Sequence, residues 1–347
     1  MAEKVIIVGG GMSGLLAANQ LADDFEVEVY EQKLHYHKTC SGILSHAKDS
    51  LIRISSKYIQ NEIDTVRIHS PDNNFVEFKF RQPDAILKRD EFLDGLANSA
   101  EKKGAIVNMG RRFDIANADA KHIVGADGAS SNVARHFSMF GQRTFFMGQK
   151  AIVQYANDNI VEVWPFSGGF GWIVPHNRHE AEIGTMSYQK DIGVFDRFCS
   201  ARNIIAKEKE AQLIPLHNPD VRTFKDTGKQ KIYLIGDAAT AVKATTGGSI
   251  VQSLVMAKSL KESMLFKKDF DRLWKSKIGR ELWLHLKLRR ILDSFSDKDM
   301  NSLIREVNEA GIKELLEKES RDYPSRFLFK ILMRKPSLLK YVPKMLA

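Results

Sequence analysis

The residues best suited to chemistry lie in one glycine-rich stretch, Gly236 to Ile250. An apolar run at residues 231–235 predicts a strand, Asp237 follows its end, and small residues then open a predicted helix. A carboxylate at this place can accept hydrogen bonds from the hydroxyl groups of a ribityl chain, while backbone N–H groups face a flavin ring. This stretch therefore predicts a flavin site.

A second glycine-rich turn lies near the N-terminus. The apolar run at residues 4–8 predicts a strand, and Gly9, Gly11 and Gly14 then form a G-x-G-x-x-G pattern at the start of a helix. The next predicted strand ends at Glu31, whose carboxylate can accept hydrogen bonds from the ribose hydroxyls of an adenosine. We predict a dinucleotide site here; the alternative is a glycine-rich turn with a purely structural role. The pattern does not distinguish NAD from FAD.

Two further features narrow the class of cofactor. Gly125-Ala126-Asp127-Gly128 follows a predicted buried strand, and Arg89 begins an Arg-x-x-Phe helix start. Together with the two turns above, they resemble the FAD-dependent oxidoreductases of the aromatic hydroxylase class, whose three turns surround one extended FAD. The resemblance implies that Arg89 lies near the cofactor phosphates, although a surface arginine at a helix start would look the same. Asp127 is predicted to orient its own loop.

The stretch after Gly236 resembles the geranylgeranyl reductase family more closely. That family's pattern runs approximately GDAAGFVxPxTGGGI, and here the chain reads GDAATAVKATTGGSI. Ala244 stands where Pro is usual and Ser249 where the third Gly is usual, departures that bear on the substrate more than on the cofactor. The residues predicted to bind FAD are Gly9, Gly11, Ser13, Gly14, Glu31, Arg89, Asp237, Thr246, Gly247, Gly248 and Ser249.

Three more stretches are similar to the same family. Residues 38–42 resemble its K-x-C-G segment, residues 170–175 its aromatic-x-W-x-F-P strand, and residues 279–282 its Gly-x-Glu-Leu helix. The first implies that Cys40 lies beside the flavin, where its thiol could donate a proton or orient an alkene. The alternative is a small buried hydrophobe. Lys38 could stabilise charge on the flavin or remain solvated.

The resemblance also implies an activity. Geranylgeranyl reductases use FAD to reduce isolated C=C bonds in isoprenoid chains, including those of archaeal membrane lipids, so we expect FAD-dependent hydrogenation of an isoprenoid lipid. NAD(P)H or ferredoxin would supply the electrons. The competing hypothesis is a flavin-dependent monooxygenase or halogenase acting on a small aromatic substrate, because residues 170–175 partly match that class's W-x-W-x-I-P strand. A flavin-binding protein without catalysis is a third alternative.

Four aromatic residues could line a channel for such a substrate. Phe170 and Trp172 alternate along one predicted strand, and Trp164 and Phe166 along its neighbour. Because side chains two apart in a strand share a face, these aromatics could form an apolar wall. The same alternation would describe the core of a β-sandwich. Two histidines in the next turn have no third ligand, so we predict no metal site.

An α/β fold must position these residues. We predict a Rossmann-like FAD-binding domain, an interleaved antiparallel-sheet substrate domain and a helical C-terminal region. The predicted FAD-binding domain is discontinuous and comprises residues 1–50, 89–143 and 225–290. The predicted substrate domain comprises residues 51–88 and 144–224, and the helical region residues 291–347.

Composition restricts the remaining function classes. The 347 residues are 43% hydrophobic and 27% charged, as in an ordinary globular protein, and no apolar run approaches the roughly 18 to 20 residues of a membrane-spanning helix. The first residues lack a secretory signal pattern, which predicts a cytoplasmic location. Cys40 and Cys199 are too few for a disulfide framework, and Cys199 is predicted to lie in the core.

The net charge of +9 is concentrated near the C-terminus, with +7 in residues 258–290 and +6 in residues 321–347. Such a surface suits an anionic lipid or nucleic acid. An amphipathic helix is predicted from basic and apolar residues at helical spacing: Arg326, Lys330 and Arg334 beside Phe327, Leu328 and Ile331. We favour peripheral contact with the inner face of a membrane over nucleic acid, for which no recognition fold is present. The alternative is a helix packed on the body.

Overall fold

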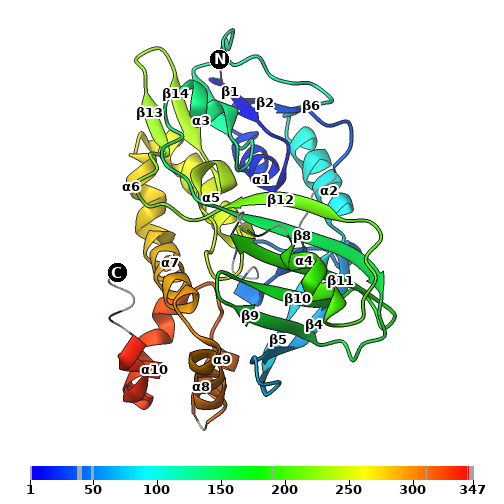
Figure 1. Ribbon diagram of the computed structural model, residues 1–347. Helices are drawn as coiled ribbons and strands as arrows, with labels where there is room; N and C mark the ends of the chain where they lie inside the picture. Colours follow the sequence, from blue (N-terminus) through cyan, green and yellow to red (C-terminus); the bar gives the residue numbers. More distant parts are fainter. Residues whose placement is uncertain are drawn as a thin grey trace.

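The computed structural model describes residues 2–36, 41–47, 51–188, 191, 193–309, 311–341 and 343. One layer of the molecule is a six-stranded sheet (Figure 1). In spatial order its strands are β13 (Phe224–Asp226), β14 (Lys231–Leu234), β7 (His122–Gly125), β1 (Lys4–Val8), β2 (Glu26–Glu31) and β6 (Ile106–Met109). Neighbouring strands are parallel except for β13 and β14.

Helices cover this sheet, which explains why its central strands are apolar along their length. They are α1 (Met12–Leu21), α2 (Arg89–Lys102), α3 (Asn132–His136) and α5 (Ile250–Phe266). Helix α1 packs against both α2 and α5. Ile7 of β1, Leu15 of α1 and Leu260 of α5 are fully buried in the same apolar core. Because β1, β7 and β14 run in parallel, the turns that follow them lie at one edge of the sheet.

A second, eight-stranded sheet lies beside the first (Figure 1). In spatial order its strands are β12 (Glu210–Pro215), β8 (Phe145–Gln154), β11 (Glu180–Tyr188), β10 (Gly169–Pro175), β9 (Val161–Phe166), β4 (Ile59–His69), β5 (Phe75–Leu87) and β3 (Ile43–Leu44). All neighbouring pairs are antiparallel except β4 and β9. Helix α4 (Val194–Ser200) packs on β11, and Cys199 is buried there, as predicted. Burial raises the pKa of its thiol.

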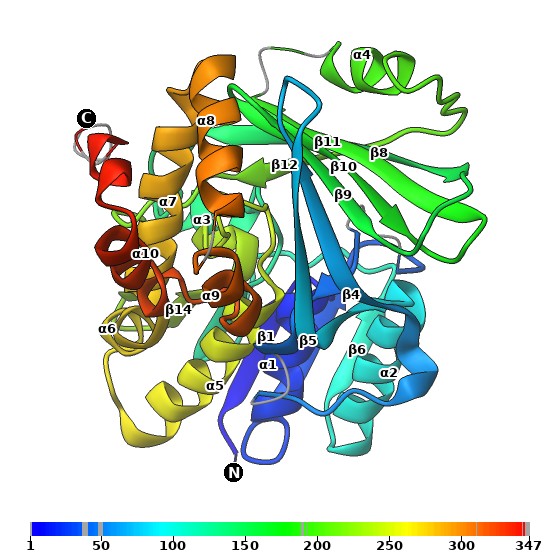
Figure 2. The same cartoon turned by 90° about the horizontal axis from the view of Figure 1, so that it is seen from below.

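Helices fill most of the remaining chain. They are α6 (Phe270–Trp274), the π-helical turn η4 (Lys275–Gly279), α7 (Arg280–Asp293), α8 (Asp297–Asn308), α9 (Lys313–Lys318) and α10 (Leu328–Arg334). Short 3-10 turns are η2 (Ser56–Tyr58), η3 (Gly236–Ala239), η5 (Pro324–Arg326) and η6 (Pro336–Tyr341). Helices α8 and α9 pack against β5, and Figure 2 shows them beside the long β4–β5 hairpin. Over the described ranges, no helix is long and apolar enough to cross a membrane.

The predicted fold class is confirmed: the chain combines a Rossmann-like sheet, an interleaved and mainly antiparallel sheet, and C-terminal helices. The boundaries between domains stay a prediction. Strand β3, at residues 43–44, pairs with β5 of the larger sheet, whereas the prediction assigns residues 1–50 to the FAD-binding domain. Such a short edge strand carries too little sequence pattern to be assigned to a sheet in advance.

Candidate functional site

The three glycine-rich turns meet at one edge of the six-stranded sheet. Gly9, with φ +105°, lies so close to the middle turn that a Cβ atom would be 2.4 Å from the Ala126 carbonyl oxygen. A Cβ atom on Gly236, with φ +62°, would lie 2.0 Å from Ser13 Oγ. Both φ values fall in the left-handed region that favours glycine. The turns predicted to surround one cofactor are therefore adjacent in space.

Gly14 and Gly11 differ in what surrounds them. A Cβ atom on Gly14 would lie 1.9 Å from the Gly9 carbonyl oxygen, so α1 packs directly on the turn. A Cβ atom on Gly11 would meet no described atom within 4 Å, and no side chain caps the start of α1. Open space beside uncapped N–H groups suits the close approach of a pyrophosphate. This geometry fits a dinucleotide cofactor such as FAD.

Glu31 lies at the end of β2, beside the same turn. Its Oε2 accepts a hydrogen bond of 2.9 Å from the Gly10 N–H, and its Oε1 accepts one of 3.0 Å from the Lys33 N–H. A Cβ atom on Gly10 would be 2.7 Å from the Glu31 Cβ, which leaves little room between them. The carboxylate thus stabilises the turn, and its predicted bond to a ribose stays a prediction.

A cavity of about 530 Å³ begins beside these turns. Several residues predicted to bind FAD line it: Ser13, Arg89, Asp237, Thr246, Gly247, Gly248 and Ser249. Ser249 Oγ donates a hydrogen bond of 3.1 Å to Asp237 Oδ1, which joins the turn after β14 to the start of α5. Arg89 is buried at the start of α2. The described lining does not include Gly9, Gly11, Gly14 or Glu31.

The two predicted catalytic residues, Lys38 and Cys40, lie outside the described residues. Their proximity to a flavin therefore stays a prediction. The next described residue, Ser41, lines the cavity.

Beyond the flavin side, most of the cavity wall is apolar. Residues of β4 and β5 form one part of this wall, residues of β9 and β10 a second, and residues of α8 and α9 a third. Figure 2 labels these six elements. Representative residues, two from each part, are Ile68, Phe78, Val163, Phe170, Ile304 and Leu316. An elongated apolar ligand could contact all three parts of the wall. Such contacts are favourable because they remove apolar surface from water, and they need no particular orientation of the groups involved.

The four aromatic residues predicted to form a channel do not share one face. Phe170 and Trp172 line the cavity, but Trp164 and Phe166 are absent from its described lining. In the antiparallel pairing of β9 with β10, Val163 lies opposite Trp172, so Trp164 points to the other face.

On that other face Trp164 belongs to a separate aromatic cluster. It stacks on His69, with ring centroids 4.4 Å apart, and the Arg202 guanidinium lies 4.0 Å from its ring centroid. The prediction for Trp164 is corrected accordingly: it does not line the channel but packs against the apolar cluster between the sheet and α4.

A buried acid fixes the orientation of Trp172. The indole Nε1–H donates a hydrogen bond of 2.9 Å to Glu182 Oε1, and Lys150 Nζ lies 3.0 Å from Glu182 Oε2. Glu182 is 1% exposed, and Lys150 lines the cavity. A second acid, Glu210, lies 3.8 Å from Lys150 Nζ. Trp172 is therefore held at the cavity wall by a charged pair on the same face of the sheet.

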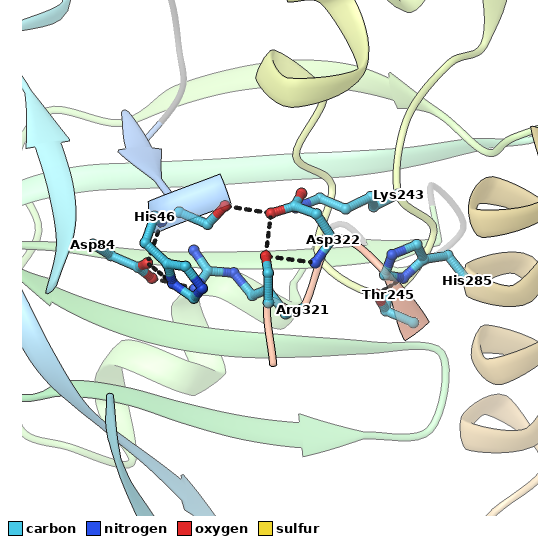
Figure 3. A network of polar contacts seen from close by, with 9 residues as sticks. His46, Asp84, Lys243, Thr245, His285, Arg321 and Asp322 are labelled. Atoms are coloured by element: carbon cyan, nitrogen blue, oxygen red, sulfur yellow. Dashed lines mark hydrogen bonds and ion pairs between the residues drawn. The ribbon is translucent and has the colours of Figure 1, made fainter. Parts of the chain in front are cut away.

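A polar cluster at the cavity was not predicted (Figure 3). Lys243 Nζ lies 2.5 Å from Asp322 Oδ1, and both residues line the cavity. Ser45 Oγ donates a hydrogen bond to the other oxygen of Asp322. Arg321, the neighbour of Asp322, pairs with Asp84 of β5. Arg321 and Asp322 are part of the basic segment of residues 321–347. Sequence alone does not show that these two residues fold back into the interior.

His285 of α7 closes one side of this cluster. Its Nδ1 lies 2.7 Å from Thr245 Oγ1, and Figure 3 shows the imidazole pointing at Thr245. Burial lowers the pKa of His285 to about 3, so the imidazole is neutral at physiological pH. It adds no charge to the cluster.

The middle turn has a local structural role, as predicted. Asp127 accepts hydrogen bonds from the Ser131 hydroxyl and from the Asn132 and Val133 N–H groups, and thereby caps α3. Among the residues that the structure describes, no group of three His, Cys, Asp or Glu side chains could hold a metal ion.

Comparisons with known proteins support the same cofactor class. Residues 7–36 match the family model of the NAD(P)-binding Rossmann-like domain. Digeranylgeranylglycerophospholipid reductase 2 of Methanopyrus kandleri is 25% identical, over 98% of both chains. Digeranylgeranylglycerophospholipid reductase of Methanocaldococcus jannaschii is 24% identical, over 99% of this chain and 98% of that one.

Solved structures share the fold. A geranylgeranyl bacteriochlorophyll reductase-like protein from Thermoplasma acidophilum superposes with a TM-score of 0.79 at 18% identity, over 99% of both chains. The flavin-dependent halogenase CmlS superposes with a TM-score of 0.64 at 15% identity, over 98% of this chain and 78% of that one. At these identities the structural likeness concerns the fold alone.

Proposed function

We propose that the chain is a geranylgeranyl-reductase-like FAD-dependent oxidoreductase that hydrogenates C=C bonds of a geranylgeranyl lipid in archaeal-type membrane lipid biosynthesis. The observation that carries this proposal is the largely apolar cavity that begins beside the glycine-rich turns. A small aromatic substrate would not need walls from two sheet regions and two helices. The relatives' names support the same substrate class.

Bound FAD supplies the hydride in this chemistry. The chain would bind its pyrophosphate at the open start of α1, and its ribityl chain near Asp237. The apolar walls would hold the isoprenoid chain and exclude water, and the anchored Trp172 would limit the positions that the chain can take. Cys40 remains the proposed proton donor or alkene-orienting residue, and Lys38 the residue proposed to stabilise charge on the flavin. NAD(P)H or ferredoxin is the proposed source of electrons.

The test is anaerobic mixing of the reduced, FAD-loaded protein with a geranylgeranyl glycerophospholipid. Oxidation of the flavin, together with a substrate mass that rises by two hydrogens for each bond reduced, is the expected result. A flavin that stays reduced beside unchanged lipid would overturn the proposal. Oxygen-dependent hydroxylation or chlorination of a small aromatic compound would instead favour the competing monooxygenase or halogenase hypothesis.

We also propose that α10 brings the protein to an anionic membrane, where a lipid substrate would be found. The helix differs from its predicted orientation: Phe327 and Ile331 are buried in the C-terminal apolar cluster. The apolar residues that remain exposed are Phe329, at 71%, and Met333, at 68%. Basic side chains such as Lys330, which pairs with Glu319, flank them.

Replacing Phe329 and Met333 with Ser should weaken binding to vesicles that contain anionic lipid by at least about tenfold. Burial of one such side chain contributes roughly 1.5 to 3 kcal/mol, and partial insertion retains a share of that. Vesicle cosedimentation measures the effect. Ile205→Ser is the matched control, because Ile205 is exposed on a different part of the protein. Equal binding by the double variant and the wild type would refute this role of α10.

A further inference from the structure

A buried ion pair stands in the cavity beside the predicted flavin site. Lys243 Nζ and Asp322 Oδ1 are 2.5 Å apart, and their side chains are 8% and 0% exposed. Ser320 Oγ donates a second hydrogen bond, of 3.2 Å, to the Asp322 oxygen that accepts from Ser45. Both charged groups are therefore held in fixed positions.

The backbone ties Lys243 to the glycine-rich loop. Its N–H donates a hydrogen bond of 3.0 Å to the Gly248 carbonyl, and its carbonyl accepts one of 2.8 Å from the Gly247 N–H. The side chain then folds over the loop, because a Cβ atom on Gly248 would lie 3.3 Å from Lys243 Cε and 3.5 Å from Nζ. The ammonium group thus lies against Gly248, one of the residues predicted to bind FAD.

Asp322 retains its charge at this buried position. Burial alone would raise the pKa of its carboxyl group, but the charges of Lys243 and Arg321 and the hydrogen bonds outweigh burial and hold the pKa below its usual range. Arg321 has its own partner, Asp84. The cation in contact with the loop is thus Lys243, and Asp322 is its partner; the pair of Arg321 and Asp84 lines the same cavity.

Stability does not account for such a pair. Taking two charges out of water is costly, and apolar residues of similar volume are often as stabilising or more so in such a place. The surrounding wall is largely apolar, so apolar side chains at positions 243 and 322 would fit their surroundings. A function in which fixed charge matters is a better explanation.

We propose that Lys243 stabilises the negative charge that the FAD ring system gains on two-electron reduction, and that Asp322 moderates this effect by partly neutralising Lys243. The proposal rests on the FAD site described above and assigns both residues as tuning residues of the cofactor. A cation near the ring system lowers the energy of the reduced, more negative flavin. An anion paired with that cation weakens this stabilisation.

The test measures the reduction potential of the bound FAD in dithionite titrations with a reference dye, without substrate. For Lys243→Met, the ratio of reduced to oxidised flavin at a fixed potential should fall at least about tenfold, which is about 30 mV for a two-electron couple. For Asp322→Asn the ratio should rise by a similar factor. Lys243→Arg keeps the charge and should stay near the wild type.

Lys261→Met is the matched control. Lys261 Nζ lies 2.6 Å from Asp24 Oδ2, but both side chains are about a third exposed, so solvent screens their charge. Its ratio should stay within about threefold of the wild-type value, since solvent and salt screen an exposed charge.

The double variant Lys243→Met/Asp322→Asn guards against failure of a single variant to fold, because it leaves no buried charge without a partner. Its potential should lie between those of the two single variants. If no variant shifts the ratio by more than about twofold, or if both single variants shift it in the same direction, the proposal is wrong. Substrate turnover is measured separately, so loss of the proposed lipid reduction with intact potential shifts would refute the function and leave this inference standing.

Discussion

Replacement of Gly14 with Ala should both destabilise the protein and prevent FAD binding. The new Cβ atom would lie 1.9 Å from the Gly9 carbonyl oxygen, so α1 would have to move away from the turn that follows β1. Overpacking of this kind costs about 1 to 3 kcal/mol, and a clash with rigid backbone belongs at the upper end. Urea unfolding measures the loss of stability, and flavin absorbance of the purified protein measures retained FAD.

Gly11→Ala is the contrasting variant. A Cβ atom there meets no described atom within 4 Å, and the backbone, with φ −74°, is one that alanine adopts readily. The free energy of unfolding without cofactor should therefore stay within about 0.5 kcal/mol of the wild-type value. FAD affinity should fall about tenfold to a hundredfold, because the methyl group occupies space needed by the pyrophosphate. Unchanged FAD affinity for Gly11→Ala would place the pyrophosphate elsewhere.

The meeting of the three glycine-rich turns could be predicted because its signals are local. Glycines at fixed spacing after an apolar strand specify a turn whose conformation other residues adopt poorly, as the positive φ of Gly9 and Gly236 shows. Parallel pairing of β1, β7 and β14 then brings separate turns together without further information from side chains. The α/β class followed from the same local patterns.

The substrate side could be predicted only in part, because it depends on strand register. Trp164 and Trp172 have the same alternation in sequence, yet they point to opposite faces. The pairing of Val163 with Trp172 decides this, and a shift of one residue would reverse it. No short-range pattern in β9 or β10 encodes that register.

The polar cluster could not be predicted because its members are far apart in sequence. Asp322 meets Lys243 and Ser45 only after the C-terminal segment folds back into the cavity. In the sequence, Arg321 and Asp322 stand among surface charges, and Lys243 occupies a variable position of a family pattern. The one signal next to Lys243 is Ala244, which stands where the resembled family usually has Pro.

The cavity therefore has a polar wall beside the glycine-rich loop and a mostly apolar wall farther from it. Around Gly247 and Gly248, fixed charges and backbone N–H groups surround the proposed flavin. Farther on, most of the wall is apolar, and the ion pair of Glu182 and Lys150 beside Trp172 orients the indole ring. Removal of that pair should test whether the far wall depends on a buried acid.

Replacement of Glu182 with Ala should lower the free energy of unfolding by about 3 kcal/mol, since it removes the nearest counter-charge of a buried cation. Lys150 Nζ would lose its contact at 3.0 Å, and the Trp172 indole N–H would lose its acceptor at 2.9 Å. Glu210, at 3.8 Å from Lys150, compensates only in part, which keeps the expected loss at the low end of the range for buried pairs. Urea unfolding measures it.

Two controls separate charge from packing. Glu180→Ala, two residues earlier on β11, removes an acid that is about a third exposed and lies 3.4 Å from His176, so it should cost less than about 1 kcal/mol. Glu182→Gln/Lys150→Met removes both charges while Gln can still accept from Trp172, and should recover most of the lost stability. If Glu182→Ala is as stable as Glu180→Ala, the pair does not hold the wall. If the double variant is as unstable as Glu182→Ala, packing rather than the loss of the nearest counter-charge of Lys150 causes the loss of stability.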